Sequence, residues 1–134
     1  MENPSLRSLG AKVVVVSSSD EKHPPENIID GNTESFWMST GLFPQEFIIG
    51  FTHSTNISAV TMDSYNVKHL KLEKNTSQSA SQFESVTEKE FDHVTGCLQS
   101  NTLPVNGIVA THLRFIITSG HDHFVSVHRV SVQL

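Results

Sequence analysis

The sequence is short of cysteine and alanine, and each shortage excludes a class of protein. Cys97 is the only cysteine in 134 residues, so no disulfide can form within the chain, and a reducing compartment fits better than secretion. Alanine occurs only 4 times, whereas valine, isoleucine and threonine together supply 33 residues. β-Branched side chains lose rotamer freedom in a helix and suit a pleated surface, which argues against a helical bundle.

Basic residues and long apolar runs are also scarce. Nine Lys and Arg stand against 14 Asp and Glu, giving a net charge of −5 with no basic cluster, so we expect no nucleic-acid partner. The longest apolar run, residues 13–16, is far shorter than the roughly 20 residues of a membrane span, so membrane insertion is not expected. The first residues lack the basic and apolar regions of a secretory signal, which predicts a protein that is not secreted.

Alternating apolar and polar residues predict several short β-strands. Residues 57–62 and 68–73 show the alternation most clearly, and the denser apolar segments 46–51 and 113–117 predict more deeply buried strands. Residues 12–17 form a further strand and residues 84–91 a weaker one. Turn residues recur about every ten positions, which predicts an all-β sandwich or jelly roll in a single domain over residues 1–134, with a mobile serine-rich surface loop near residues 75–82.

The C-terminal strand contains a change of phase. Its apolar residues occupy odd positions first and even positions afterwards: Val125 and Val127, then Val130, Val132 and Leu134. A regular strand would expose one of these two sets to solvent. We therefore expect a bulge near His128 and Arg129.

The segment 27–37 gathers oxygen-bearing side chains around a glycine. Asp30, Asn32 and Ser35 supply a carboxylate, an amide and a hydroxyl, and Gly31 allows the backbone to turn sharply. Hard cations such as calcium need several such oxygens. On residue types alone, we favour a plain Asx turn that caps a short helical turn, with Trp37 as a core anchor.

Other candidate sites are weaker. The histidine cluster (His121, Asp122, His123 and His128) has no metal-ligand spacing, and we interpret these residues as solvated loop side chains rather than zinc ligands.

Cys97 lies near His93, yet no catalytic motif is present, so we expect no enzyme activity. Phe43, in a predicted loop, either stacks on a sugar ligand or packs over the end of the sandwich; the sequence leaves both open.

A family resemblance adds to this interpretation. Asp30, Gly31, Ser35 and Trp37 resemble the Asp-Gly-x-x-x-Thr-x-Trp signature of discoidin, or coagulation-factor C-type, domains. Residues 47–51 resemble the next strand of that family, and residues 125–132 its closing strand. The resemblance implies an all-β fold, an eight-stranded antiparallel jelly-roll sandwich of the galactose-binding-domain-like type.

The resemblance also implies a calcium ion as the cofactor. The family positions that bind calcium correspond to Asn27, through its carbonyl, and to Asp30, Asn32 and Ser35. Ser35 replaces the usual threonine and keeps the hydroxyl. Arg129 stands where many members carry a glutamate that completes the calcium shell, and a cation pointing inward there would repel the ion.

Within the family, the chain most resembles compact members of the ciliary transport machinery. This implies a non-enzymatic subunit of intraflagellar transport complex B that forms a heterodimer with a Rab-like small GTPase subunit, intraflagellar transport protein 27. It further implies location in the cilium and cytoplasm, a role in Hedgehog signalling, and no small-molecule substrate. Two faces could receive the partner, one near Phe115 and Ile116 and one around residues 124–129. The alternative is a glycan- or lipid-binding discoidin module.

Overall fold

The computed structural model describes residues 10–16, 28, 37–38, 43–75, 83–92, 99–121 and 125–133. These residues form seven strands: β1 (Lys12–Val16), β2 (Trp37–Met38), β3 (Gln45–Tyr65), β4 (Val67–Asn75), β5 (Glu84–Glu90), β6 (Gln99–Gly120) and β7 (Ser126–Gln133). All strand pairs are antiparallel, so the predicted all-β class is confirmed. No helix long and apolar enough to cross a membrane occurs in the described ranges.

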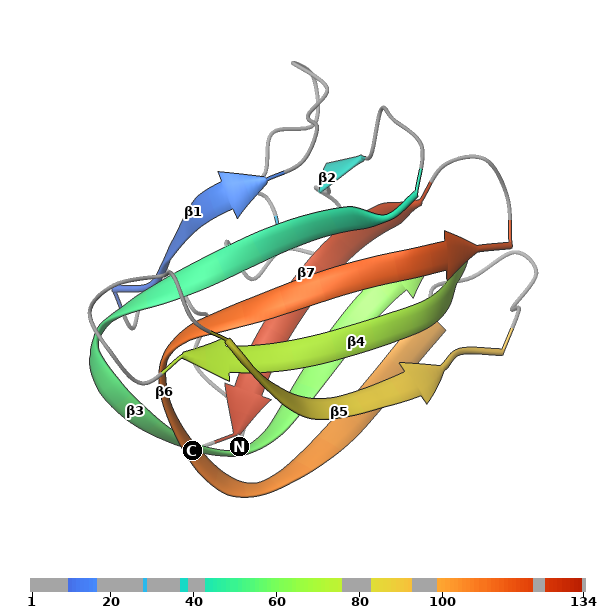
Figure 1. Cartoon of the computed structure of the whole chain (residues 1–134). Helices are drawn as coiled ribbons and strands as arrows, with labels where there is room; N and C mark the ends of the chain where they lie inside the picture. Colours follow the sequence, from blue (N-terminus) through green and yellow to red (C-terminus); the bar gives the residue numbers. More distant parts are fainter. Residues whose placement is uncertain are drawn as a thin grey trace.

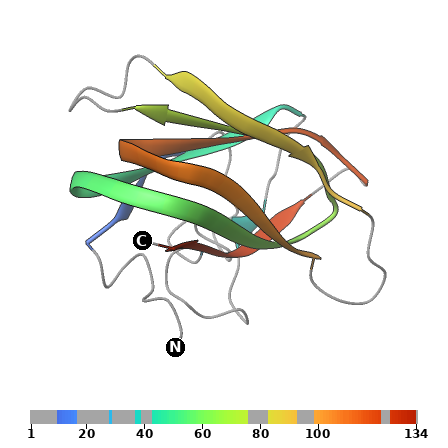
Figure 2. The same ribbon diagram turned by 90° about the horizontal axis from the view of Figure 1, so that it is seen from below.

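One hydrogen-bonded sheet folds over into two layers. The strand order is β2-β7-β3-β6-β4-β5, with β1 paired to β3. Figures 1 and 2 show that β3 and β6 curl back on themselves. The first half of β3 pairs with β1, and its second half pairs with β7. On its other edge, β3 pairs with β6 along both halves, and β6 also pairs with β4. The two long strands therefore connect the layers.

The continuity of β3 and β6 corrects two sequence predictions. Residues 46–51 and 57–62 were expected as separate strands but belong to the single strand β3, and residues 113–117 are part of β6. The pairing of β3 with β6 shifts register between Gly50 and Thr55 and again between Ile57 and Ala59. Such bulges bend a strand without ending its pairing. Gly107 lies in β6 at the second register shift, and its φ of +75° is a left-handed conformation that glycine adopts without steric cost.

Aromatic side chains fill the centre of the core between the layers. Trp37, Phe47 and Phe115 are each fully buried. The rings of Phe47 and Phe115 stack with centroids 4.7 Å apart, and Trp37 meets Phe47 edge-on at 5.6 Å. Each ring comes from a different strand (β2, β3 and β6), so this cluster ties together segments far apart in the sequence.

The predicted bulge in β7 is confirmed. Arg129 pairs with Asp63, but the next residue of β3, Ser64, pairs with Val127, so His128 is an extra residue in β7. The bulge rotates the strand by one position. As a result the odd-numbered valines before it and the even-numbered valines after it are all buried (Val125, Val127, Val130 and Val132).

A buried glutamine holds the β3–β4 turn. Asn66 adopts φ +64° between the two strands, a conformation that asparagine tolerates better than most residues. The Gln99 amide donates to the carbonyls of Val67 (2.9 Å) and Asp92 (2.8 Å), and its oxygen accepts from the N–H of Val67 (3.1 Å) and the hydroxyl of Ser64 (3.2 Å). Gln99 is 2% exposed, so these bonds replace water for groups that could not otherwise reach it.

Candidate functional site

The predicted calcium ligands Asn27, Asp30, Asn32 and Ser35 lie outside the described residues. Within the same segment, Ile28 and Trp37 are described, and both are fully buried in the core. Trp37 starts β2 and pairs with Val127 of β7. The prediction of Trp37 as a core anchor is therefore confirmed, and the calcium ligand set stays a prediction.

Arg129, the residue expected to disturb the calcium shell, lies on β7 two positions beyond Val127. It is half-buried and stands opposite Asp63 of β3 in the strand register. Arg129 thus belongs to the strand that pairs with Trp37, the last residue of the calcium-signature segment.

The histidine cluster does not form one surface loop. His128 is buried in β7, where its Nε2 lies 3.2 Å from Ser126 Oγ and its ring meets Tyr65 edge-on at 5.4 Å, so its prediction as a solvated loop residue was wrong. The β7 bulge, which turns this position away from solvent, is the physical reason. His121 is exposed after β6, where Nε2–H donates to the Phe91 carbonyl at 2.9 Å.

Asp122, His123, His93 and Cys97 lie outside the described residues. In the part of the chain that is described, no group of three or more histidine, cysteine, aspartate or glutamate side chains could hold a metal ion.

Phe43 packs over the end of the sandwich. It is half-buried against the core, and it lies close to Gly120 at the end of β6. A Cβ on Gly120 would lie 2.7 Å from Phe43 Cζ and 3.0 Å from Val125 Cγ1, so the glycine leaves the space that the phenyl ring fills. Of the two roles left open by the sequence, the structure favours packing for Phe43.

The two faces considered for a partner differ in accessibility. Phe115 is fully buried in the aromatic core and cannot form a surface, which corrects that part of the prediction. Ile116, the next residue of β6, is half-buried on the opposite, outer side of the sheet. In the segment 124–129, the described residues Val125, Val127 and His128 are buried within this chain. The outer face near Ile116 is therefore the more accessible of the two.

An arginine organises the charges on this outer face. Arg114 of β6 bonds Glu46 of β3 twice, with Nε 2.6 Å and Nη2 2.5 Å from Oε2. Its Nη1 donates to Oε1 of Glu73 in β4 at 3.1 Å. Its guanidinium also lies 5.5 Å from the ring centre of Phe83. One cation thus links three strands and holds two carboxylates in fixed positions.

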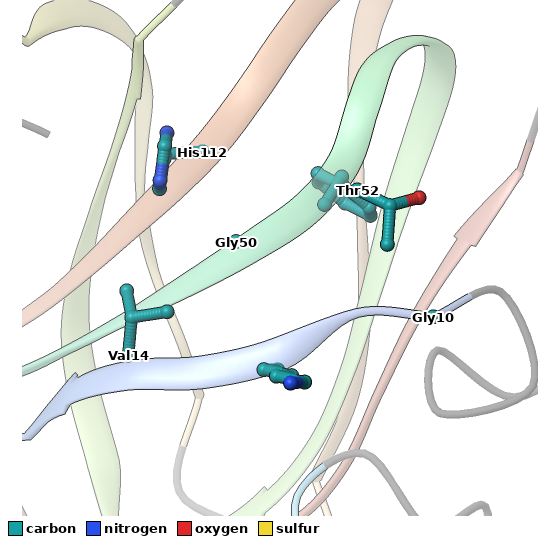
Figure 3. Close-up of a pocket in the computed structure, with 7 residues that line it drawn as sticks. Gly10, Val14, Gly50, Thr52 and His112 are labelled. Atoms are coloured by element: carbon teal, nitrogen blue, oxygen red, sulfur yellow. The ribbon is translucent and has the colours of Figure 1, made fainter. Parts of the chain in front are cut away.

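A pocket of about 210 Å³ lies on the outer side of β1, β3 and β6. Its lining comes from Gly10 and the first half of β1, from the bend of β3 and from one residue of β6: Gly10, Lys12, Val14, Gly50, Phe51, Thr52 and His112. Figure 3 shows Val14, Gly50 and His112 on three successive strands. Val14 is 48% exposed, so the pocket has an apolar rim beside its polar groups.

Sequence reasoning missed this pocket, because its residues are far apart in the chain and only strand register brings them together. One signal was present. Gly50 interrupts an otherwise apolar strand, and a glycine inside a strand often marks a bend or a close approach of another group.

Comparison with known proteins gives one family and a consistent fold. The F5/8 type C domain family matches residues 13–130. The chain is 52% identical to the intraflagellar transport protein 25 homolog of Homo sapiens over 96% of this chain and 89% of the human protein. It is 43% identical to intraflagellar transport protein 25 of Chlamydomonas reinhardtii, over 98% of this chain and 69% of the algal protein.

Solved structures share the fold at low sequence identity. CpGH89CBM32-5 from Clostridium perfringens, in complex with GalNAc-β-1,3-galactose, matches with a TM-score of 0.83 and 20% identity over 99% of this chain and all of that domain. The family 32 module of C. perfringens NanJ, in complex with galactose, matches with a TM-score of 0.81 and 13% identity over 98% of both chains. These similarities confirm the predicted galactose-binding-like jelly roll.

Proposed function

The chain belongs to the F5/8 type C domain family and, within it, to the intraflagellar transport protein 25 homologues, and on this basis we propose that it is a non-enzymatic subunit of intraflagellar transport complex B. The observation that carries the proposal is 52% identity to the human homologue over 96% of the chain. The low similarity to sugar-binding modules supports the fold alone.

We further propose that the subunit forms a stable heterodimer with a Rab-like small GTPase subunit, intraflagellar transport protein 27. The pair would act in the cilium and cytoplasm and support the ciliary transport of Hedgehog signalling components. A rigid antiparallel sandwich suits this role, because its sheet faces present side chains in fixed positions to a folded partner. A permanent heterodimer of this kind buries more than about 1,000 Å².

The outer face of β6 around Ile116 is the surface that we assign to this partner. Ile116 offers a half-exposed apolar side chain, and Arg114 beside it is already ordered by Glu46 and Glu73. Ordering of charged side chains before binding lowers the entropy lost on association.

Co-expression with the GTPase subunit followed by size-exclusion chromatography tests this assignment. The wild-type chain should elute as a 1:1 complex. Ile116→Asp should lower the affinity by at least about tenfold, because complex formation would then bury the new carboxylate away from water. Val109→Asp, at an exposed valine elsewhere on β6, is the matched control and should bind like wild type. Equal binding by both variants would contradict the assignment of this face.

We also propose a structural calcium ion bound through Asn27, Asp30, Asn32 and Ser35. The support is chemical: the set offers only oxygen donors, which is what calcium requires, although Asp30 is its single carboxylate. A site with one carboxylate suits a structural ion rather than a sensor. Asp30→Ala should therefore leave binding of the GTPase subunit largely unchanged while abolishing calcium-dependent stabilisation.

The second candidate function is a glycan- or lipid-binding discoidin module. Its support is the shared architecture, but the described aromatic Phe43 is taken up by packing. A glycan array and a vesicle-binding assay with the purified chain separate the two functions. Retention on either surface without any complex B subunit in a pulldown would favour the second.

A further inference from the structure

A row of three residues crosses the outer face of the sheet where β1, β3 and β6 lie side by side. The register pairs Lys12 with Gly50 and Gly50 with His112. The two outer strands are separated by two strand spacings, roughly 10 Å. Because Gly50 has no side chain, the space above it remains open, and both Lys12 and His112 line it. Figure 3 shows His112 and Val14 on the two strands that flank Gly50.

The space is closely bounded. A Cβ on Gly50 would lie 3.2 Å from His112 Cδ2, 3.4 Å from His112 Nε2 and 3.2 Å from Val14 Cγ1. Any larger residue at position 50 would therefore push against the imidazole and the valine. His112 Nε2 borders the space above Gly50, where a bound group could reach it.

A hydrogen-bond chain fixes the tautomer of His112. The hydroxyl of Thr111 donates its single hydrogen to the Asn75 carbonyl at 3.0 Å. The same oxygen lies 3.0 Å from His112 Nδ1, so it accepts there, and Nδ1 carries a hydrogen. In the neutral imidazole, Nε2 then carries a lone pair at the pocket, and no hydrogen bond between the described residues involves it. It becomes a donor only when the ring takes up a second proton.

The pocket is positive in a protein of net charge −5. Among the described residues that line it, Lys12 is the only charged one and none is acidic. Arg114, two positions along β6, is paired with Glu46 of β3 and Glu73 of β4. On β3, Nδ1 of the exposed His53 lies 3.0 Å from Oγ1 of the lining residue Thr52. The β4 residue opposite His112 is the neutral Asn75.

We propose that this pocket binds a carboxylate, the side chain of a glutamate from a partner polypeptide, between Lys12 Nζ and His112 Nε2. Lys12 supplies a charge-assisted hydrogen bond to one oxygen. The second oxygen accepts from Nε2–H, so binding takes up one proton from solvent and leaves His112 as an imidazolium. Val14 and Phe51 contact the methylene groups of the glutamate.

Titration of the full-length ¹⁵N-labelled chain with the peptide acetyl-Gly-Glu-Gly-amide tests the proposal. Saturable NMR shifts at Gly50 and His112 are expected. The affinity should be about tenfold higher than for a control peptide in which glutamine replaces the glutamate. Affinity should rise as the pH is lowered, because binding takes up one proton from solvent. Acetate is the third ligand. If acetate binds as tightly as the glutamate peptide, the site recognises a free carboxylate rather than a polypeptide. If acetate binds more weakly than that peptide, the site recognises a glutamate within a polypeptide.

Three variants complete the test. Lys12→Met should weaken the glutamate peptide about tenfold. Lys89→Met, which removes an equivalent exposed lysine from the distant edge strand β5, should have no effect. His112→Gln should remove the pH dependence, and Gly50→Ala should block the site while the chain stays folded. Equal affinities for the two peptides, equal losses in the two lysine variants, or pH-independent binding would each overturn the proposal.

Discussion

Replacing Gln99 by leucine tests the role of the buried amide at the β3–β4 turn. The substitution keeps the volume similar but leaves the N–H and C=O of the fully buried Val67 without their partner. Each unsatisfied buried group costs about 1–3 kcal/mol, and the added apolar burial offsets part of this. We expect Gln99→Leu to lower the free energy of unfolding by about 2–4 kcal/mol, a large share of the roughly 5–15 kcal/mol of an ordinary domain.

Urea unfolding followed by fluorescence measures this loss directly, because the chain has a single tryptophan, Trp37, and it is fully buried. With a slope of about 1–3 kcal/mol per molar urea, the midpoint should fall by at least about 0.7 M. Gln133→Leu, at an exposed position in β7, is the matched control. If the two variants agree within about 0.5 kcal/mol, the hydrogen bonds of Gln99 do not stabilise the turn.

Two further predictions concern the calcium turn and the end of the sandwich. Wild-type protein should be stabilised by about 2.7 kcal/mol when calcium exceeds its Kd a hundredfold, whereas Asp30→Ala should melt at the same temperature in calcium and in chelator. Identical wild-type melting in both buffers would contradict calcium binding. Gly120→Ala should destabilise the protein by about 1–3 kcal/mol, because its Cβ would lie 2.7 Å from Phe43 Cζ and 2.9 Å from the Asn66 carbonyl oxygen; an unchanged melting temperature would refute that packing.

Local pattern was sufficient where a feature lies within one strand. The change of phase among the valines of β7 is visible in the sequence, and it predicted the bulge that the register places at His128. The burial of Trp37 followed in the same way from its position after a turn-rich segment. In both cases, a run of consecutive residues determines the geometry.

Features that depend on pairing between distant segments could not be predicted. The polar residues 52–56 resemble a loop, yet β3 continues through them, because bulges bend the strand while its pairing resumes. The bonds of Gln99 join residues 7 to 35 positions away. Lys12, Gly50 and His112 form a row only in the folded register.

The central claim is that this chain works as a subunit of the intraflagellar transport machinery, and affinity purification of the tagged full-length chain from ciliated cells tests it most directly. Quantitative mass spectrometry should recover the Rab-like GTPase subunit in a 1:1 ratio, together with further complex B subunits. Recovery of no complex B subunit, together with binding of the same preparation to glycans or lipid vesicles, would contradict the claim.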